Sequence, residues 1–143
     1  MTLSVTHHTG HAHGLSEAVE SFVRHTPGVI QAIVVSEDGL LLAQSAYLGR
    51  DDCERFAAIT SAMTSLAVGA ARTYDLGQMN KLVVDLDRAF LLLGSFGPVA
   101  WLGVMARRDT DLGGLARDVA DFVERNATAA IGLADGAHAG FRS

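Results

Sequence analysis

The stretch that decides the fold is residues 51–74, which read DDCERFAAITSAMTSLAVGAARTY. No charged side chain occurs between Arg55 and Arg72, and the residues between them are mostly small or apolar. Asp51 or Asp52 can cap a helix start, and acidic residues in a first turn are favoured by the helix dipole. The sequence therefore predicts one long helix with an uncharged middle.

This predicted helix has two sides without charge, whereas a surface helix has one. At about 100° per residue, one side collects large residues, and we assign it to the core: Phe56, Ile59, Met63, Leu66 and Ala70. The opposite side is small or apolar where a solvated helix would carry Lys, Glu or Arg: Ala57, Ala58, Ser61, Ala62, Ser65, Val68 and Gly69. Because one small domain covers only one side of a helix, a partner should cover the other, most simply a second copy of the chain.

Length and composition describe one globular domain. The chain has 143 residues, of which 49% are hydrophobic and 19% charged, with a formal net charge of −5. This charge, with no run of Lys or Arg, argues against nucleic acid as a partner. No apolar run reaches the ~20 residues of a membrane span, and the N-terminus lacks the features of a secretion signal. A single cysteine, Cys53, excludes an internal disulfide and fits the reducing cytoplasm.

The remaining segments alternate between helical and strand patterns. A helix from Leu15 to His25 ends at Pro27-Gly28, and a last helix runs from a cap at residues 109–111 to about Ala127. The expected strands are rich in β-branched residues and separated by turns, and they are Val29 to Val35, Leu40 to Ala46, Asn80 to Leu86, Ala89 to Ser95 and Val99 to Ala106. The order α-β-β-α-β-β-β-α predicts an α/β (α+β) fold: one five-stranded, mainly antiparallel sheet with helices on its faces.

Two terminal segments are expected to lie outside this domain, which we place at residues 14–128. Residues 1–13 are interpreted as a disordered leader, and residues 129–143 as a flexible tail. The leader contains several histidines, but no Cys or carboxylate is interleaved with them, so a metal site is not predicted. These histidines are His7, His8, His11 and His13.

No pattern in the chain predicts catalysis, a cofactor or a metal. Neither GxxxxGK[ST] nor GxGxxG after a strand occurs. Cys53 falls in a first helical turn, where a thiol pKa can be lowered, but no histidine near it in sequence offers a base. Asp85 and Asp87 are explained by turn formation and by blocking a sheet edge. Trp101 and Tyr74 are interpreted as core or interface residues.

The order of elements and several local sequences resemble the Roadblock/dynein-light-chain family, which is related to longin domains. The resemblance covers about Leu15 to Ala127 and is greatest to actinobacterial proteins encoded beside a sensor kinase-like protein and a Ras-like GTPase. The segments that carry it are Thr26-Pro27-Gly28-Val29, Val34-Val35-Ser36-Glu37-Asp38-Gly39-Leu40, Asp51-Asp52-Cys53-Glu54-Arg55-Phe56-Ala57-Ala58 and Asp111-Leu112-Gly113.

What the resemblance implies is a non-enzymatic homodimer that binds a Ras-like small GTPase and affects its nucleotide state or location, within a complex that can include a sensor kinase-like protein. In this family the strand after the long helix pairs with its twin, and the long helices pack together. Here that implies an interface of Ala58, Ala62, Ser65, Gly69, Lys81, Leu82, Val83 and Val84. Arg72, Arg107 and Arg108 are candidates to contact the phosphates or acidic loops of a GTPase, the alternative being solvated surface arginines.

A second hypothesis is a sensory domain that binds a small ligand between sheet and helices. The uncharged helix favours the interaction protein. A ligand pocket also needs convergent polar groups, and none is evident in the sequence.

Overall fold

The helices and strands follow one another in the order that the sequence predicts. The computed structural model describes the backbone of residues 2–142 and the side chains of residues 14–136. The elements are α1 (Thr2–His25), β1 (Val29–Ser36), β2 (Leu41–Gln44), α2 (Arg50–Thr73), β3 (Lys81–Asp85), β4 (Ala89–Ser95), β5 (Ala100–Arg107) and α3 (Leu112–Arg142).

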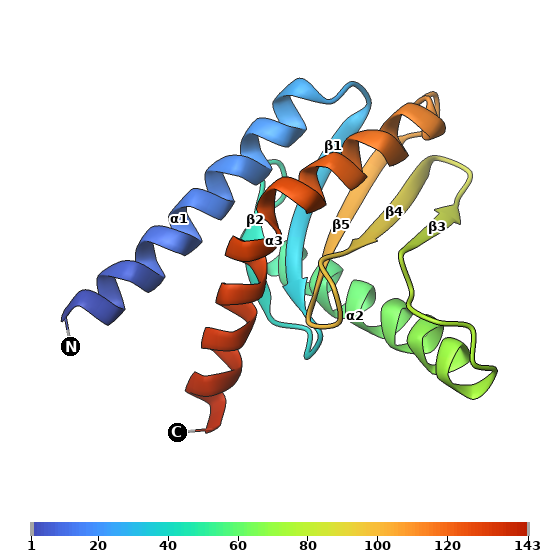
Figure 1. The fold of residues 1–143 in the computed structure, drawn as a ribbon. Coiled ribbons are helices and arrows are strands. Elements are labelled where there is room, and N and C mark those ends of the chain that lie inside the picture. Colours follow the sequence, from blue (N-terminus) through green and yellow to red (C-terminus); the bar gives the residue numbers. More distant parts are fainter. Residues whose placement is uncertain (1, 143) are drawn as a thin grey trace.

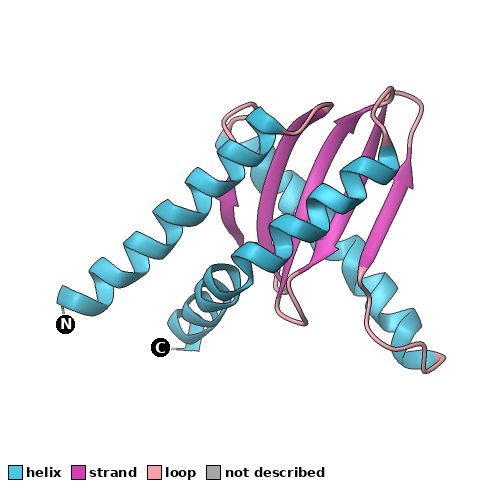
Figure 2. Ribbon diagram, turned by 45° about the horizontal axis from the view of Figure 1, so that its top comes forward, coloured by secondary structure: helices cyan, strands magenta, loops and turns pink. Residues whose placement is uncertain are grey.

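The strands form one five-stranded sheet in the order β2-β1-β5-β4-β3, and every neighbouring pair is antiparallel. Helices α1 and α3 lie on one face of this sheet, and α2 lies on the other (Figure 1). In the tilted view, α1 and α3 lie in front of the sheet and α2 lies behind it (Figure 2). The α/β fold with helices on both faces, predicted from the sequence, is confirmed.

The centre of the sheet is buried on both sides, as the nearly continuous hydrophobicity of β1 predicts. Ile33 and Val35 of β1 pack with α2, whereas Ala32 and Val34 face α1 and α3. The turn between β1 and β2 passes through Gly39 at φ +87°, a conformation that glycine adopts without a steric cost. Asp38-Gly39 between two apolar runs predicts such a hairpin from the sequence, and the structure confirms it.

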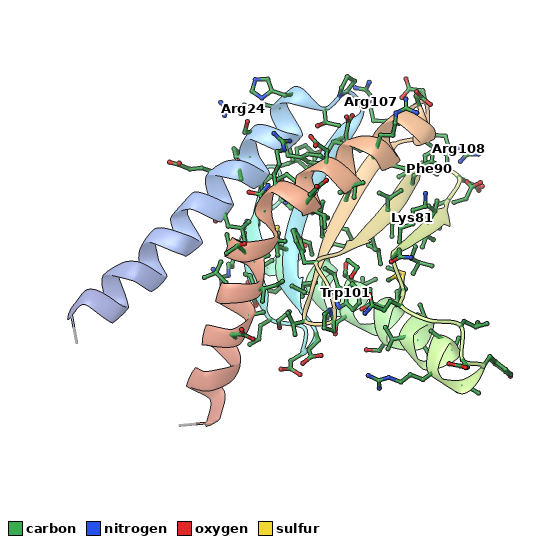
Figure 3. All side chains as sticks on the ribbon, viewed as in Figure 1. Arg24, Lys81, Phe90, Trp101, Arg107 and Arg108 are labelled. Carbon is green, nitrogen blue, oxygen red and sulfur yellow. The ribbon has the colours of Figure 1, made fainter. Side chains whose placement is uncertain are left out.

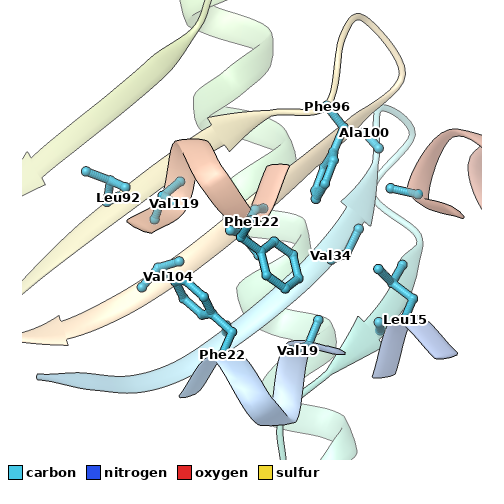
Figure 4. Close-up of a cluster of buried hydrophobic side chains, with 14 of the residues drawn as sticks. Leu15, Val19, Phe22, Val34, Leu92, Phe96, Ala100, Val104, Val119 and Phe122 are labelled. Atoms are coloured by element: carbon cyan, nitrogen blue, oxygen red, sulfur yellow. The ribbon is translucent and has the colours of Figure 1, made fainter. Parts of the chain in front are cut away.

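The larger core lies between the sheet and the helices α1 and α3 (Figure 4). The ring of Phe122 in α3 meets Phe22 of α1 edge to face, with centroids 5.1 Å apart, and meets Phe96 at 6.2 Å. Leu15 and Val19 are also buried there. The apolar sides of α1 and α3 therefore pack on one another and on the sheet.

Helices α1 and α3 are both longer than the sequence predicts. α3 continues to Arg142, because Ala130, Leu133 and Ala134 are buried and extend its apolar stripe. Residues 130–134 are therefore part of this packed helix. α1 begins at Thr2 instead of Leu15, and no proline interrupts it. The side chains of the four leader histidines lie outside the described residues, and the division into leader, domain 14–128 and tail stays a prediction.

The buried side of α2 differs from the prediction. It consists of Cys53, Phe56, Ala57, Thr60 and Thr64, so of the predicted large stripe only Phe56 is buried. Ile59 and Leu66 are 52% and 77% exposed. A search for apolar periodicity does not select the two threonines, because they are polar. The hydroxyl of Thr64 nevertheless donates to the carbonyl of Thr60 at 2.9 Å and needs no solvent. The N-cap is Gly49, not Asp51 or Asp52.

Two strand glycines let helices approach the sheet closely. A Cβ on Gly103 of β5 would lie 3.1 Å from the Thr60 hydroxyl and 3.2 Å from Ile33, so α2 is seated directly on β5. A Cβ on Gly94 of β4 would lie 2.8 Å from Cγ1 of Val119 in α3. A glycine inside a strand often marks a close approach of another part of the backbone, and Gly103 is such a position.

We expect Gly94→Ala to lower the free energy of unfolding by about 1–3 kcal/mol, because the added methyl overlaps the buried side chain of Val119. Urea denaturation measures this. Gly113→Ala is the matched control, since its Cβ would meet only Asp111 at 3.7 Å, and it should be neutral or stabilising. Equal stability of the two variants would contradict the close packing of α3 on β4.

Candidate functional site

The first candidate surface is the side of α2 that faces away from the sheet. We call it the α2 outer face, and its residues are all exposed: Ala58, Ile59, Ala62, Ser65, Leu66, Gly69 and Ala70. Single exposed apolar side chains are common, but a continuous apolar face without charge indicates an interaction site. The four helix residues predicted for the interface lie here. Ile59 and Leu66 also lie here, although periodicity alone places both in the core.

The second candidate surface is the free edge of β3. This strand is last in the sheet order and pairs with β4, so its other edge is open within the described chain. Lys81, Val83 and Asp85 are exposed, and Val83 is 38% exposed. Leu82 and Val84 are half-buried and alternate with them. An exposed edge strand with apolar residues is a template for pairing with another strand.

The two surfaces lie on the same side of the molecule. In the register of the sheet, Leu82 pairs with Leu93, Leu93 with Gly103, and Gly103 with Ile33, which packs against α2. Leu82 and Val84 therefore point to the α2 side of the sheet. α2 packs chiefly on β1, β2 and β5, away from this edge.

The three arginines predicted to contact a partner do not converge. Arg107 and Arg108 lie at the opposite end of the sheet from Trp101 (Figure 3), whereas Arg72 lines a pocket with Trp101. The guanidinium of Arg108 stacks on the ring of Phe90 at 4.5 Å and pairs with Asp85. Arg107 pairs with Asp109 at 3.3 Å. Of these three arginines, Arg72 alone forms no ion pair with a described residue.

Cys53 is part of a buried polar network that ties the start of α2 to β1. The amide of Gln31 donates to the sulfur of Cys53 at 3.3 Å and to the carbonyl of Ser45 at 3.1 Å. Its oxygen accepts from the backbone N–H of Leu48 at 2.9 Å. Burial, and then the charge of Asp52, raise the pKa of the Cys53 thiol above its ordinary value. A reactive cysteine needs the opposite, a lowered pKa and exposure, so Cys53 has a structural role.

The described residues contain no group of three His, Cys, Asp or Glu side chains placed to hold a metal ion. Within the same part of the chain, no helix has both the length and the apolar character for crossing a membrane.

Solved structures share this fold. A Roadblock/LC7 domain from Streptomyces avermitilis is 28% identical, covers 77% of this chain and 92% of its own, and superposes with a TM-score of 0.73. A second structure of a Roadblock/LC7 domain from Streptomyces avermitilis is 30% identical, covers 78% of this chain and 96% of its own, and has a TM-score of 0.65. MglB from Myxococcus xanthus has a TM-score of 0.77 at 13% identity, covers 85% of this chain and 91% of its own, and so shows a common fold only. No curated protein matches the chain.

A sheet with one helix on one face, two on the other and a free edge strand defines the class as a longin-like α/β domain. The family model of the Roadblock/LC7 domain matches residues 15–106, from α1 into β5. The chain belongs to the Roadblock/LC7 domain family.

Proposed function

We propose that this protein is a non-enzymatic, cytoplasmic homodimer that binds a Ras-like small GTPase and modulates its nucleotide state or location. The observation that carries the proposal is the α2 outer face, which is apolar and exposed beside an open strand edge. Membership of the Roadblock/LC7 family and the fold shared with MglB support the GTPase as the partner. A sensor kinase-like protein stays a prediction of the family resemblance.

The sequence of β3 is complementary to itself. In an antiparallel pair of two copies centred on Val83, Val83 faces its twin and Leu82 faces Val84. In the same register Lys81 of each copy faces Asp85 of the other. Cross-strand pairs of apolar residues and of opposite charges stabilise a sheet. A shift of the pairing by one residue would set Lys81 against an apolar side chain, so this register is favoured.

Pairing of the β3 edges would bring the two α2 helices together on one face of the joined sheet. Leu82 and Val84 point to that face, and the α2 outer face is directed away from the protomer that carries it. Ala58, Ala62, Ser65 and Gly69 are small, so the helices can approach closely. The dimer would thereby remove Ile59 and Leu66 from water, where each large side chain contributes about 1.5–3 kcal/mol on full burial.

Ala62→Glu tests the helix contact. Ala62 is exposed in the protomer, so the variant should fold normally, but in the dimer it buries an unpaired carboxylate. That costs several kcal/mol, and we expect the dimer to weaken at least about a hundredfold. Analytical ultracentrifugation measures the association. Ala120→Glu, on an exposed position of α3, is the control and should leave it unchanged. If both variants remain equally dimeric, this face is not the interface.

Lys81→Asp and Asp85→Lys test the register. Each variant alone places like charges opposite one another at both ends of the strand pair, and we expect roughly tenfold weaker association. In a mixture of the two variants, the introduced aspartate of one faces the introduced lysine of the other, and the two unchanged residues also face one another. A heterodimer therefore regains both ionic contacts. Native mass spectrometry distinguishes the species when one variant carries a mass label. A mixture that associates no better than its components would exclude the register centred on Val83.

The GTPase hypothesis is tested by direct binding. The immobilised chain should retain a Ras-like GTPase from its own genome differently in the GDP form and with a non-hydrolysable GTP analogue. Nucleotide hydrolysis or exchange measured with and without the chain then gives the direction of the effect. If no such GTPase binds the immobilised chain in either nucleotide state, the proposed partner is wrong, whatever the oligomeric state of the chain.

A further inference from the structure

A pocket lies beneath the C-terminal half of α2, where the helix passes the end of the sheet at the β1–β2 turn. Its volume is about 370 Å³, within the lower part of the range for small-molecule sites. Residues from several separate parts of the fold line it. They include Glu37 of this turn, Val68 and Arg72 of α2, Met79 of the loop before β3, Pro98 of the β4–β5 turn and Trp101 of β5. Because these residues are distant in the chain, their convergence is not evident from the sequence.

The floor of the pocket is apolar and firmly placed. Trp101 is 5% exposed and belongs to the core cluster that Phe56 and Val35 form beneath α2. Val68 and Met79 pack against the same cluster. An aliphatic or aromatic group can lie against this floor without a rearrangement of the sheet.

The rim of the pocket carries charges of both signs from opposite elements. Arg72 comes from the last turn of α2, and two carboxylates, those of Glu37 and Asp38, come from the β1–β2 turn. Among the described residues, Arg72 and Glu37 pair neither with each other nor with another charged side chain. Both charges are therefore available for a ligand above an apolar floor.

From this geometry we propose that the pocket binds a zwitterion with an apolar side chain, of the class of free amino acids and dipeptides. The carboxylate pairs with the Arg72 guanidinium, the ammonium group with the Glu37 carboxylate, and the side chain lies on Trp101. Charge-assisted contacts of this kind orient a ligand as well as hold it. Ser65 and Gly69 of the α2 outer face also line the pocket, so the ligand lies at the border of the proposed dimer contact.

Trp101 makes the test direct, because it is the only tryptophan of the chain. Leucine, phenylalanine and leucyl-leucine are titrated into the isolated protein while tryptophan fluorescence and the thermal unfolding midpoint are followed. We expect a saturable fluorescence change and a raised midpoint with at least one of them. The N-acetylated and C-amidated forms of that ligand each lack one charge and should bind about tenfold more weakly or worse.

Charge-neutral variants assign the contacts. Arg72→Gln and Glu37→Gln should each weaken binding about tenfold or more. Arg55→Gln and Glu54→Gln, exposed positions near the start of α2 and outside the pocket, should bind as the natural chain does. The absence of saturable binding by all three ligands would overturn the proposal. Equal binding by the N-acetylated form, or by the Arg72→Gln and Arg55→Gln variants, would also overturn it. None of these measurements involves a GTPase, so their outcome is independent of the proposed function.

Discussion

The close seating of α2 on β5 is the contact on which the rest of the structure depends. Gly103 has no side chain, so Thr60 and Phe56 reach the sheet directly. At the point of contact the helix places Ala57, Thr60 and the flat ring of Phe56 against the sheet. This orientation directs Ile59 and Leu66 outward, so the surface proposed for self-association arises from a packing requirement of the core.

Much of the fold could be predicted from the sequence, because each local pattern had one interpretation. The β-branched run of β1, the Asp38-Gly39 turn and the single apolar stripes of α1 and α3 all agree with the structure. α2 was different. Both of its sides lack charge, and periodicity does not rank two uncharged sides. The choice depended on Gly103, three strands further along the chain, which decides which side fits against the sheet.

For the candidate sites as well, the sequence predicts what lies within one segment but not which distant segments meet. The small residues of α2 and the edge strand β3 could be found from the sequence and the family resemblance, because each is one continuous segment. The order of the strands in the sheet separates Arg72 from Arg107. The same order brings Arg72 and Glu37 to one pocket with Trp101. The ionic contact of Arg108 with Asp85 likewise joins residues far apart in sequence.

The open edge of β3 has a consequence for how this protein persists in a cell. In the proposed dimer, association and folding are linked equilibria, because the paired form alone shields Leu66 and the edge from water. By mass action, a concentrated solution would then hold a more heat-resistant protein than a dilute one. Expression level would set the lifetime of each copy, and chains made in small amounts would be the first exposed to proteases.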